Sequence, residues 1–144
     1  MFHFIKTPLG NIQIEIVDNH IISCNFIGKI KSKDDIIIDN QFVKIIDDYF
    51  NLKKQPIFNI KFEGTDFQIS VWKSIMNIPI GQTKTYSDIA KDIGKPTSIR
   101  AVANACGKNK IALFVPCHRV VRKNDIGGYR WGFQKKQFLL NLEK

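Results

Sequence analysis

The chain has 144 residues, 44% of them hydrophobic, and a formal net charge of +9. This length suits one domain of ordinary size or two small lobes, and the apolar content is too high for a disordered chain. Charges interrupt every apolar run before it reaches the length of a bilayer span, and the N-terminus lacks the pattern of a signal peptide. The composition therefore excludes a membrane-spanning protein and predicts a soluble, cytoplasmic one.

The first part of the chain has the pattern of a β-rich lobe. Apolar and polar residues alternate over residues 12–16 between two turn sequences, and residues 21–27 have the pattern of the returning strand. Apolar side chains recur at helical spacing over residues 40–51, which predicts an amphipathic helix. Alternation over residues 58–62 predicts a further strand. We assign residues 1–62 to an N-terminal β-sheet lobe with one helix.

Residues 63–144 have the pattern of a mostly helical lobe. Thr65 or Asp66 can cap a first helix, and a short second helix is expected over residues 85–93. A third begins after Thr97 or Ser98. Two short helices joined by a tight turn have the outline of a helix-turn-helix, although many helical hairpins bind no DNA. The predicted fold class is α/β, in the α+β sense of a sheet lobe followed by a helical lobe.

The positive charge is confined to the second part of the chain. Residues 1–80 contain nine Lys/Arg and nine Asp/Glu, whereas residues 81–144 contain thirteen Lys/Arg and four Asp/Glu. A concentrated basic surface attracts polyanions, because phosphate contacts release counterions. A surface that merely keeps the protein in solution explains the same charge equally well.

The cysteine content argues against disulfides and metals. Cys24, Cys106 and Cys117 are too few and too widely spaced for a disulfide framework or a zinc ribbon. His3 and His20, taken with Cys24, match no standard spacing of metal ligands and are better explained as strand residues. We expect no metal and no cofactor.

The segment FVPCHRVV, residues 114–121, contains the most unusual motif. Cys117 follows an apolar run, and His118 and Arg119 come directly after it. A thiol reacts as its thiolate, which a neighbouring imidazole or guanidinium favours. On an extended backbone adjacent side chains point in opposite directions, so His118 is expected to act through a bridging water. As an isolated Cys-His pair, the motif fits a buried structural cysteine better than a nucleophile.

The motif Pro116-Cys117-His118-Arg119-Val120 resembles the active-site signature of the O6-alkylguanine-DNA alkyltransferases, or methylated-DNA–protein-cysteine methyltransferases. The likeness extends from about Gly64 to the C-terminus in the order and spacing of further motifs, namely Gly64-Thr65, Val71-Trp72, Tyr86-Ser87-Asp88-Ile89-Ala90, Gly94-Lys95-Pro96, Arg100-Ala101-Val102, Asn109, Gly128-Tyr129-Arg130-Trp131-Gly132 and Leu139-Leu140-Asn141-Leu142-Glu143. The N-terminal lobe resembles the family's variable domain only loosely.

The resemblance implies a single irreversible transfer of an alkyl group from O6 of guanine to Cys117, without a cofactor. His118 would take the thiol proton through a water, and Glu143 would orient the histidine. Tyr86 would donate a proton to the departing guanine. Asn109 would tie together the turn that precedes the Cys117 segment. The implied enzyme is a methylated-DNA–protein-cysteine S-methyltransferase.

The resemblance also implies a partner, double-stranded DNA that contains O6-alkylguanine. The target base would rotate out of the duplex, because O6 cannot be reached inside the base stack. Arg100 would fill the gap, while small residues let the third helix lie in the minor groove. The other residues expected at the DNA are Thr85, Ser98, Ala101, Ala103, Lys108 and Arg119. The pocket for the rotated base is expected to be formed by Val120, Tyr129, Arg130 and Trp131.

Two features depart from the family pattern. The loop over residues 122–128 is one residue shorter than is usual in the family, which affects the size of the pocket, and residues 108–110 are more basic. No zinc-bearing sensor domain precedes the repair domain, so a regulatory role is not expected. We expect a monomer associated with the nucleoid. The range of alkyl groups, activity on O4-alkylthymine and cooperativity on DNA stay open.

Two other classes of function compete with this hypothesis. An alkyltransferase-like module would bind the damage without transfer, but such modules lack the acceptor cysteine that is present here as Cys117. A cysteine hydrolase would use Cys117 with His118, but it needs an oxyanion hole and a water route that nothing in the sequence marks.

Overall fold

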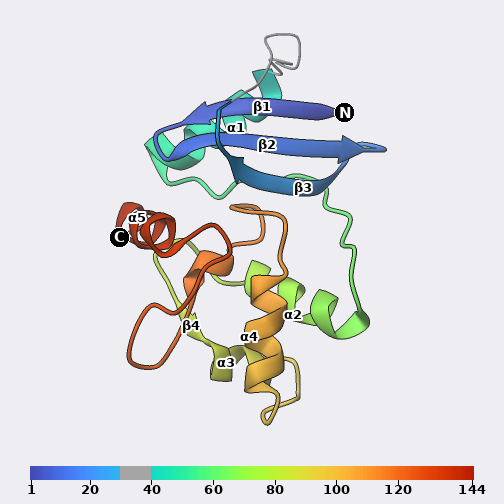
Figure 1. Cartoon of the computed structure of the whole chain (residues 1–144), viewed down its shortest axis with the longest axis vertical. Coiled ribbons are helices and arrows are strands. Elements are labelled where there is room, and N and C mark those ends of the chain that lie inside the picture. Colours follow the sequence, from blue (N-terminus) through green and yellow to red (C-terminus); the bar gives the residue numbers. More distant parts are fainter. Residues whose placement is uncertain (30–39) are drawn as a thin grey trace. The chain divides into compact units, whose positions relative to one another are not determined.

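The computed structural model describes residues 1–29 and 40–144 (Figure 1). The chain divides into two units, which are described separately. The first unit comprises Met1–Phe62 and Lys110–Phe114, and the second comprises Glu63–Asn109 and Val115–Lys144. Within the described ranges, the helices are all too short or too polar to cross a membrane.

The first unit is built on an antiparallel sheet of order β1-β2-β3. Its strands are β1 (Phe2–Thr7), β2 (Gly10–Val17) and β3 (His20–Ile27). Ile12 and Ile14 are completely buried, as the predicted alternation requires. Asp18 and Asn19 both have positive φ, the conformation of a tight hairpin turn that Asp and Asn adopt more readily than most residues. The two strands predicted at residues 12–16 and 21–27 are confirmed.

The helix α1 (Asn40–Leu52) confirms the predicted amphipathic segment and packs on β1. Phe42, Ile46 and Tyr49 are buried on its inner face, and the ring of Phe42 lies 5.0 Å from that of His3, centre to centre. His3 therefore belongs to the core of this unit, as expected of a strand residue. The cause of the helix is the helical spacing of large apolar side chains, which bury one stripe against the sheet.

The prediction of a strand over residues 58–62 is wrong, because these residues form no continuous strand. Only Ile60 forms a bridge, parallel to Ile21. The other neighbour of β3 is a segment from far along the chain, since the amide of Cys24 donates to the carbonyl of Lys110 (2.9 Å) and the amide of Ala112 donates to the carbonyl of Cys24 (2.7 Å). Short irregular segments thus form hydrogen bonds with the backbone at the edge of β3, and local periodicity could not predict these segments.

The second unit is mostly helical, as predicted, and the α+β fold class is confirmed. Its elements are α2 (Asp66–Met76), β4 (Lys84–Thr85), α3 (Tyr86–Asp92), α4 (Ile99–Gly107), η2 (Cys117–Arg119), β5 (Val120–Val121) and α5 (Phe133–Leu142). The strands β4 and β5 pair in parallel, and α2, α3 and α4 pack against one another (Figure 1). Parallel pairing of β4 with β5 brings the start of α3 beside the segment that follows Cys117.

Capping residues fix where these helices begin. Thr65 and Thr85 each form a capping box, with Gln68 and Asp88 as the reciprocal partners. Ser98 occupies the cap position of α4 without a side-chain hydrogen bond. A methyl group at Gly64 would lie 2.8 Å from the ring of Trp72, so the chain enters α2 too closely for any larger residue.

Candidate active site

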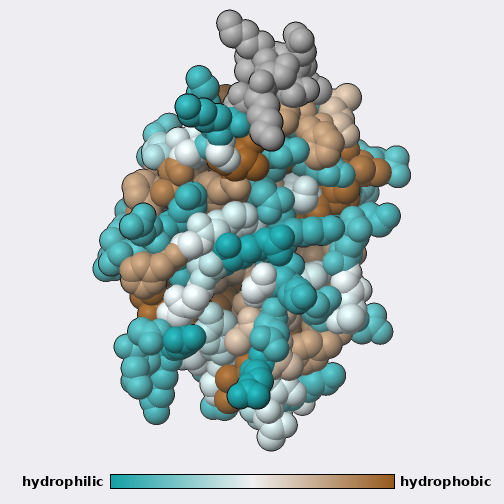
Figure 2. Space-filling model, in the orientation of Figure 1, coloured by the Kyte–Doolittle hydropathy of each residue, from teal (hydrophilic) through white to brown (hydrophobic). Residues whose placement is uncertain are grey.

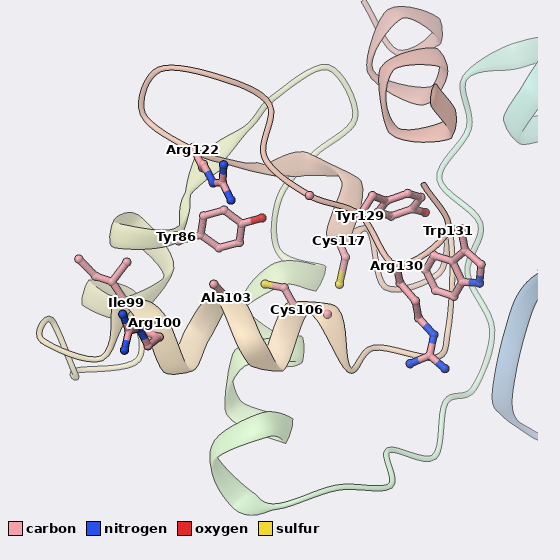
Figure 3. Close-up of a pocket in the computed structure, with 12 residues that line it drawn as sticks. Tyr86, Ile99, Arg100, Ala103, Cys106, Cys117, Arg122, Tyr129, Arg130 and Trp131 are labelled. Carbon is pink, nitrogen blue, oxygen red and sulfur yellow. The ribbon is translucent and has the colours of Figure 1, made fainter. Parts of the chain in front are cut away.

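A cavity of about 730 Å³ opens within the second unit (Figure 3). It lies between α4 and the loop that follows β5. The predicted site residues that line it are Tyr86, Arg100, Ala103, Cys117, Tyr129, Arg130 and Trp131. Sequence reasoning missed five more lining residues, which are Ile99, Cys106, Gly107, Arg122 and Gly128. The structure therefore brings together residues from four separate segments.

The sequence suggested an extended strand at Cys117, but the structure does not place Cys117 on a strand. It begins the short 3-10 helix η2, which the amide of Arg119 closes by donating to the carbonyl of Pro116 at 2.9 Å. The expectation that adjacent side chains alternate across an extended backbone is wrong here, because β5 begins only at Val120. The residue directly before Cys117 is a proline, which has no backbone N–H to donate to a strand.

The Cys117 thiol points into the cavity and is 5% exposed as a residue (Figure 3). Burial raises the pKa of Cys117 well above its usual value, and a hydrogen bond with the Cys106 thiol raises it further. A hydrogen bond from Asn109 and the charge of Lys136 lower the pKa of Cys117. Because burial is the largest of these effects, the thiol is protonated at neutral pH and needs a base to become a nucleophile.

His118 is such a base by its position and its charge state. Its Nε2 donates to Oε2 of Glu143 at 2.6 Å, and both residues are buried. A carboxylate only accepts, so Nε2 carries the proton and Nδ1 keeps its lone pair. Among the residues that the structure describes, none forms a hydrogen bond with Nδ1. Burial is the largest influence on the pKa of His118 and lowers it, and the charges of Arg119 and Lys136 lower it further, although Glu143 raises it; the ring is therefore neutral and can accept a proton.

Glu143 is held from its other side by Arg119. Nε and Nη2 of Arg119 donate to the two carboxylate oxygens at 2.8 and 2.9 Å, and Nη1 donates to the carbonyl of Ile78 at 2.8 Å. This bidentate pair joins the end of α5, η2 and the segment after α2. The prediction that Arg119 contacts DNA is wrong, because its side chain is 1% exposed and each of its three guanidinium nitrogens donates a hydrogen bond inside the unit.

Lys136 is a site residue that sequence reasoning missed. It is completely buried on α5, where Nζ donates to the carbonyl of Val120 at 2.6 Å and to that of Gly128 at 2.8 Å. Burial lowers the pKa of Lys136 to about 8. The ammonium group therefore ties β5 to the cavity loop and places a positive charge near Cys117.

The remaining predicted catalytic residues lie close to the thiol. The hydroxyl of Tyr86 points toward the Cys117 side of the cavity (Figure 3), and burial raises the pKa of Tyr86 to about 12, which keeps the phenol protonated. Asn109 is buried and its Nδ2 donates to the carbonyl of Val115 at 3.2 Å. It thereby closes the turn that leads to Cys117, in addition to its bond to the thiol.

The loop over residues 122–128 packs directly on Tyr86. Gly127 has a φ of +73°, and a methyl group there would lie 3.0 Å from the Tyr86 hydroxyl. Its amide donates to Asp125 at 2.7 Å, which fixes the turn. The ring of Tyr129 lies 6.4 Å from that of His118, centre to centre, and forms the next part of the wall. The loop thus covers one side of the cavity, and its contact with Tyr86 leaves little space for a larger side chain at Gly127.

The mouth of the cavity is basic. Arg100 lies near one end of α4, Arg130 lies near the other, and Arg122 lies across from the helix (Figure 3). None of the cavity's lining residues, which all lie in the described ranges, is acidic. On the molecular face in Figure 2, hydrophilic side chains predominate and hydrophobic ones form small scattered groups. The three arginines that line the cavity suit an anionic partner better than an apolar one.

The other residues predicted at the DNA or the base do not line the cavity. Thr85 uses its hydroxyl to cap α3, and Val120 is buried with its carbonyl bound to Lys136. Ala101 lies on α4, and Ser98 and Lys108 are the residues at its N-cap and C-cap. Ala101 and Lys108 are exposed, so an approaching duplex can reach them. In the described ranges, the His, Cys, Asp and Glu side chains form no group of three or more that could hold a metal ion.

Comparisons with known proteins place this site in context. The sequence family described as "6-O-methylguanine DNA methyltransferase, DNA binding domain" matches residues 66–144. A probable methylated-DNA–protein-cysteine methyltransferase of Acanthamoeba polyphaga mimivirus is 49% identical over 97% of this chain and 94% of its own length. A methylated-DNA–protein-cysteine methyltransferase of Methanosarcina barkeri is 39% identical over 99% of this chain and 96% of its own. The crystal structure of Mycobacterium tuberculosis OGT in complex with DNA has a TM-score of 0.87 at 33% identity, covering 99% of this chain and 92% of that one.

The buried Arg119–Glu143 pair predicts that substitutions at two arginines change the free energy of unfolding by very different amounts. Replacing Arg119 by Gln leaves Glu143 without its bidentate partner inside the unit, and we expect the free energy of unfolding to fall by about 3–5 kcal/mol. The matched change Arg122→Gln removes only an exposed contact of 3.8 Å to Asp125, so we expect a change within about 0.5 kcal/mol. Urea denaturation of both variants measures this difference. Equal losses would contradict the role assigned to the buried pair.

The buried ammonium of Lys136 predicts a pH-dependent stability. Its pKa is about 8 in the folded chain against a usual 10.5, so between these values the unfolded chain binds more protons. Linkage then makes the free energy of unfolding rise with pH in that window, and this contribution is lost as the pH falls through about 8.

The difference in unfolding free energy between the unaltered chain and Lys136→Met isolates that contribution. It should be flat up to about pH 7.5 and rise between about pH 8 and pH 10. Lys123→Met, which removes an exposed lysine instead, is the matched control. A flat profile for Lys136→Met as well would show that the buried lysine titrates normally.

Proposed function

Since the chain belongs to the O6-methylguanine-DNA methyltransferase family, we propose that it repairs O6-alkylguanine in double-stranded DNA by transferring the alkyl group to its own Cys117. The observation that supports this most is the arrangement at the floor of the cavity. A buried thiol faces the cavity, and a neutral histidine beside it is fixed by a carboxylate and keeps one nitrogen lone pair.

The first step is removal of the thiol proton. Nδ1 of His118 takes it through a water molecule, and Glu143 stabilises the imidazolium that forms, because its carboxylate already accepts from Nε2. Lys136 and Asn109 favour the thiolate, since both lower the pKa of Cys117. The base is needed because burial otherwise holds the proton on sulfur.

The second step is displacement at the alkyl carbon. The sulfur of Cys117 forms a bond to that carbon while the bond from carbon to O6 breaks, and the electron pair moves onto the guanine. Tyr86 donates its phenolic proton to the departing base, which leaves as neutral guanine. The high pKa of Tyr86 ensures that this proton is present. The product is a thioether on Cys117, which is a poor leaving group, so each chain reacts once.

The cavity and its basic mouth fit a rotated base. A volume of about 730 Å³ accommodates a purine with a small alkyl group, within the usual size of ligand pockets. The helices α3 and α4 serve as a helix-turn-helix, and the small side chains of α4 let it approach the minor groove. Arg100, at the start of α4, enters the base stack where the nucleotide has left. The basic residues of the mouth bind phosphates.

The roles of the other predicted site residues, and where the protein acts, are part of the same proposal. Tyr129, Arg130 and Trp131 form the base pocket, and Val120 supports it through the bond of its carbonyl to Lys136. Thr85, Ser98, Ala101, Ala103 and Lys108 contact the DNA. The protein acts as a monomer in the cytoplasm at the nucleoid. A damage-binding module without transfer is disfavoured, because Cys117 faces the cavity beside its base.

Intact-protein mass spectrometry after mixing with a duplex that contains O6-methylguanine tests the proposal. We expect a gain of about 14 Da, one methyl group in place of the thiol proton, that saturates at one per chain and maps to Cys117. Cys117→Ser should gain no mass while it still binds the duplex. Tight binding without any mass gain in the unaltered chain would instead indicate a damage-binding module, and turnover beyond one equivalent would indicate a hydrolase.

A separate prediction concerns Arg100. Replacement by Ala should slow repair of paired duplex by at least about 10-fold, because the gap in the stack is no longer filled, and should leave the reaction with free O6-alkylguanine base nearly unchanged. Lys108→Ala is the matched control, since it removes the basic residue at the C-cap of α4, which does not line the cavity. It should weaken binding and reduce the salt dependence by about one phosphate contact. Equal losses on duplex and free base for Arg100→Ala would refute its role in the stack.

A further inference from the structure

A second thiol shares the cavity with the acceptor. Cys106 lies on α4 and Cys117 on η2, both side chains line the same cavity, and Figure 3 shows both sulfur atoms in the space between these two elements. The Cys106 thiol is near enough to Cys117 to raise the pKa of Cys117. All three cysteines of the chain are free, and the mechanism above gives Cys106 no task.

The neighbourhood of Cys117 also suits oxidants. The groups that convert the thiol to a thiolate for alkyl transfer make it equally reactive toward a peroxide, because both reactions need the thiolate. A peroxide is much smaller than a purine, so a cavity that admits a base also admits it. A cysteine oxidised beyond the sulfenic acid is lost irreversibly. For a protein that uses each chain once, such loss removes repair capacity before any damage is met.

We propose that Cys106 is a resolving thiol, which captures Cys117 after peroxide oxidation as a reversible intramolecular disulfide. In the first step the Cys117 thiolate attacks one peroxide oxygen, the O–O bond breaks, and sulfenic acid and hydroxide form. In the second the sulfur of Cys106 attacks the sulfenic sulfur, the S–O bond breaks, and water leaves with the Cys106 proton. Two equivalents of a small thiol then reduce the disulfide and restore both cysteines.

The geometry favours this second step over further oxidation. A disulfide needs a sulfur–sulfur distance of about 2 Å, and two thiols that line the same small cavity (Figure 3) can reach it by side-chain rotation. Neighbouring thiols react with a high effective concentration that a dilute peroxide does not match. While the disulfide is present, Cys117 cannot form a thiolate and therefore cannot accept an alkyl group. The pair therefore pauses repair and protects the acceptor at the same time.

Peptide mapping of the unaltered, reduced chain after a modest excess of hydrogen peroxide is the test. The expected result is a loss of about 2 Da and a peptide in which Cys106 is joined to Cys117. This readout needs no alkyl transfer, so its failure and the failure of the repair hypothesis are distinguishable. Gain of about 16 or 32 Da on Cys117, with Cys106 still reduced, would overturn the proposal.

Two variants sharpen the result. In Cys106→Ser, the loss of mass should disappear and oxygen should accumulate on Cys117. Cys24→Ser is the matched control and should form the bond like the unaltered chain, because Cys24 is completely buried in the first unit. After oxidation and treatment with dithiothreitol, we expect Cys106→Ser to recover at least about 10-fold less of its own starting alkyl acceptance than the unaltered chain. Equal recovery in the two would contradict the resolving role.

Discussion

The carboxylate of Glu143 is the group on which the rest of the site depends. It accepts two bonds from Arg119 and one from His118, and all three side chains are buried. Burying these charges is costly, so the pairing contributes little net stability by itself, but removing one partner leaves a charge without compensation. The carboxylate also decides where the proton of His118 lies. A single residue at the end of α5 thereby fixes both the packing of η2 and the chemistry of the residue next to Cys117.

A second constraint is the balance between burial and reactivity. The cavity must exclude water to favour transfer, and this burial raises the pKa of Cys117. The fold offsets that effect with groups that are themselves held by the backbone, namely the ammonium of Lys136 and the amide of Asn109. Because their positions are fixed before DNA binds, no reorganisation is needed when the thiolate forms. The same reactivity makes Cys117 susceptible to oxidants, and the resolving role that we propose for Cys106 would protect it.

Much of this account could be predicted from local patterns. Alternation at Ile12 and Ile14 predicted the sheet, and the motif around Cys117, through its resemblance to the family signature, pointed to this cysteine and its histidine as the proposed acceptor and base. Local patterns could not tell that Arg119 is buried, because its partner Glu143 lies 24 residues further along the chain. Lys136 was missed for the same reason: a lysine on an amphipathic helix is usually solvated, and only the carbonyls from two other segments explain its burial.

The tautomer of His118 tests the central claim most directly. Nitrogen-15 NMR of the histidine rings at neutral pH distinguishes a proton on Nε2, a proton on Nδ1 and the imidazolium. The account predicts a neutral ring with its proton on Nε2, which titrates below the usual 6.5, so that Nδ1 is the base toward Cys117. A proton on Nδ1, or an imidazolium at neutral pH, would contradict it, because Glu143 would then not be setting the base that activates the thiol.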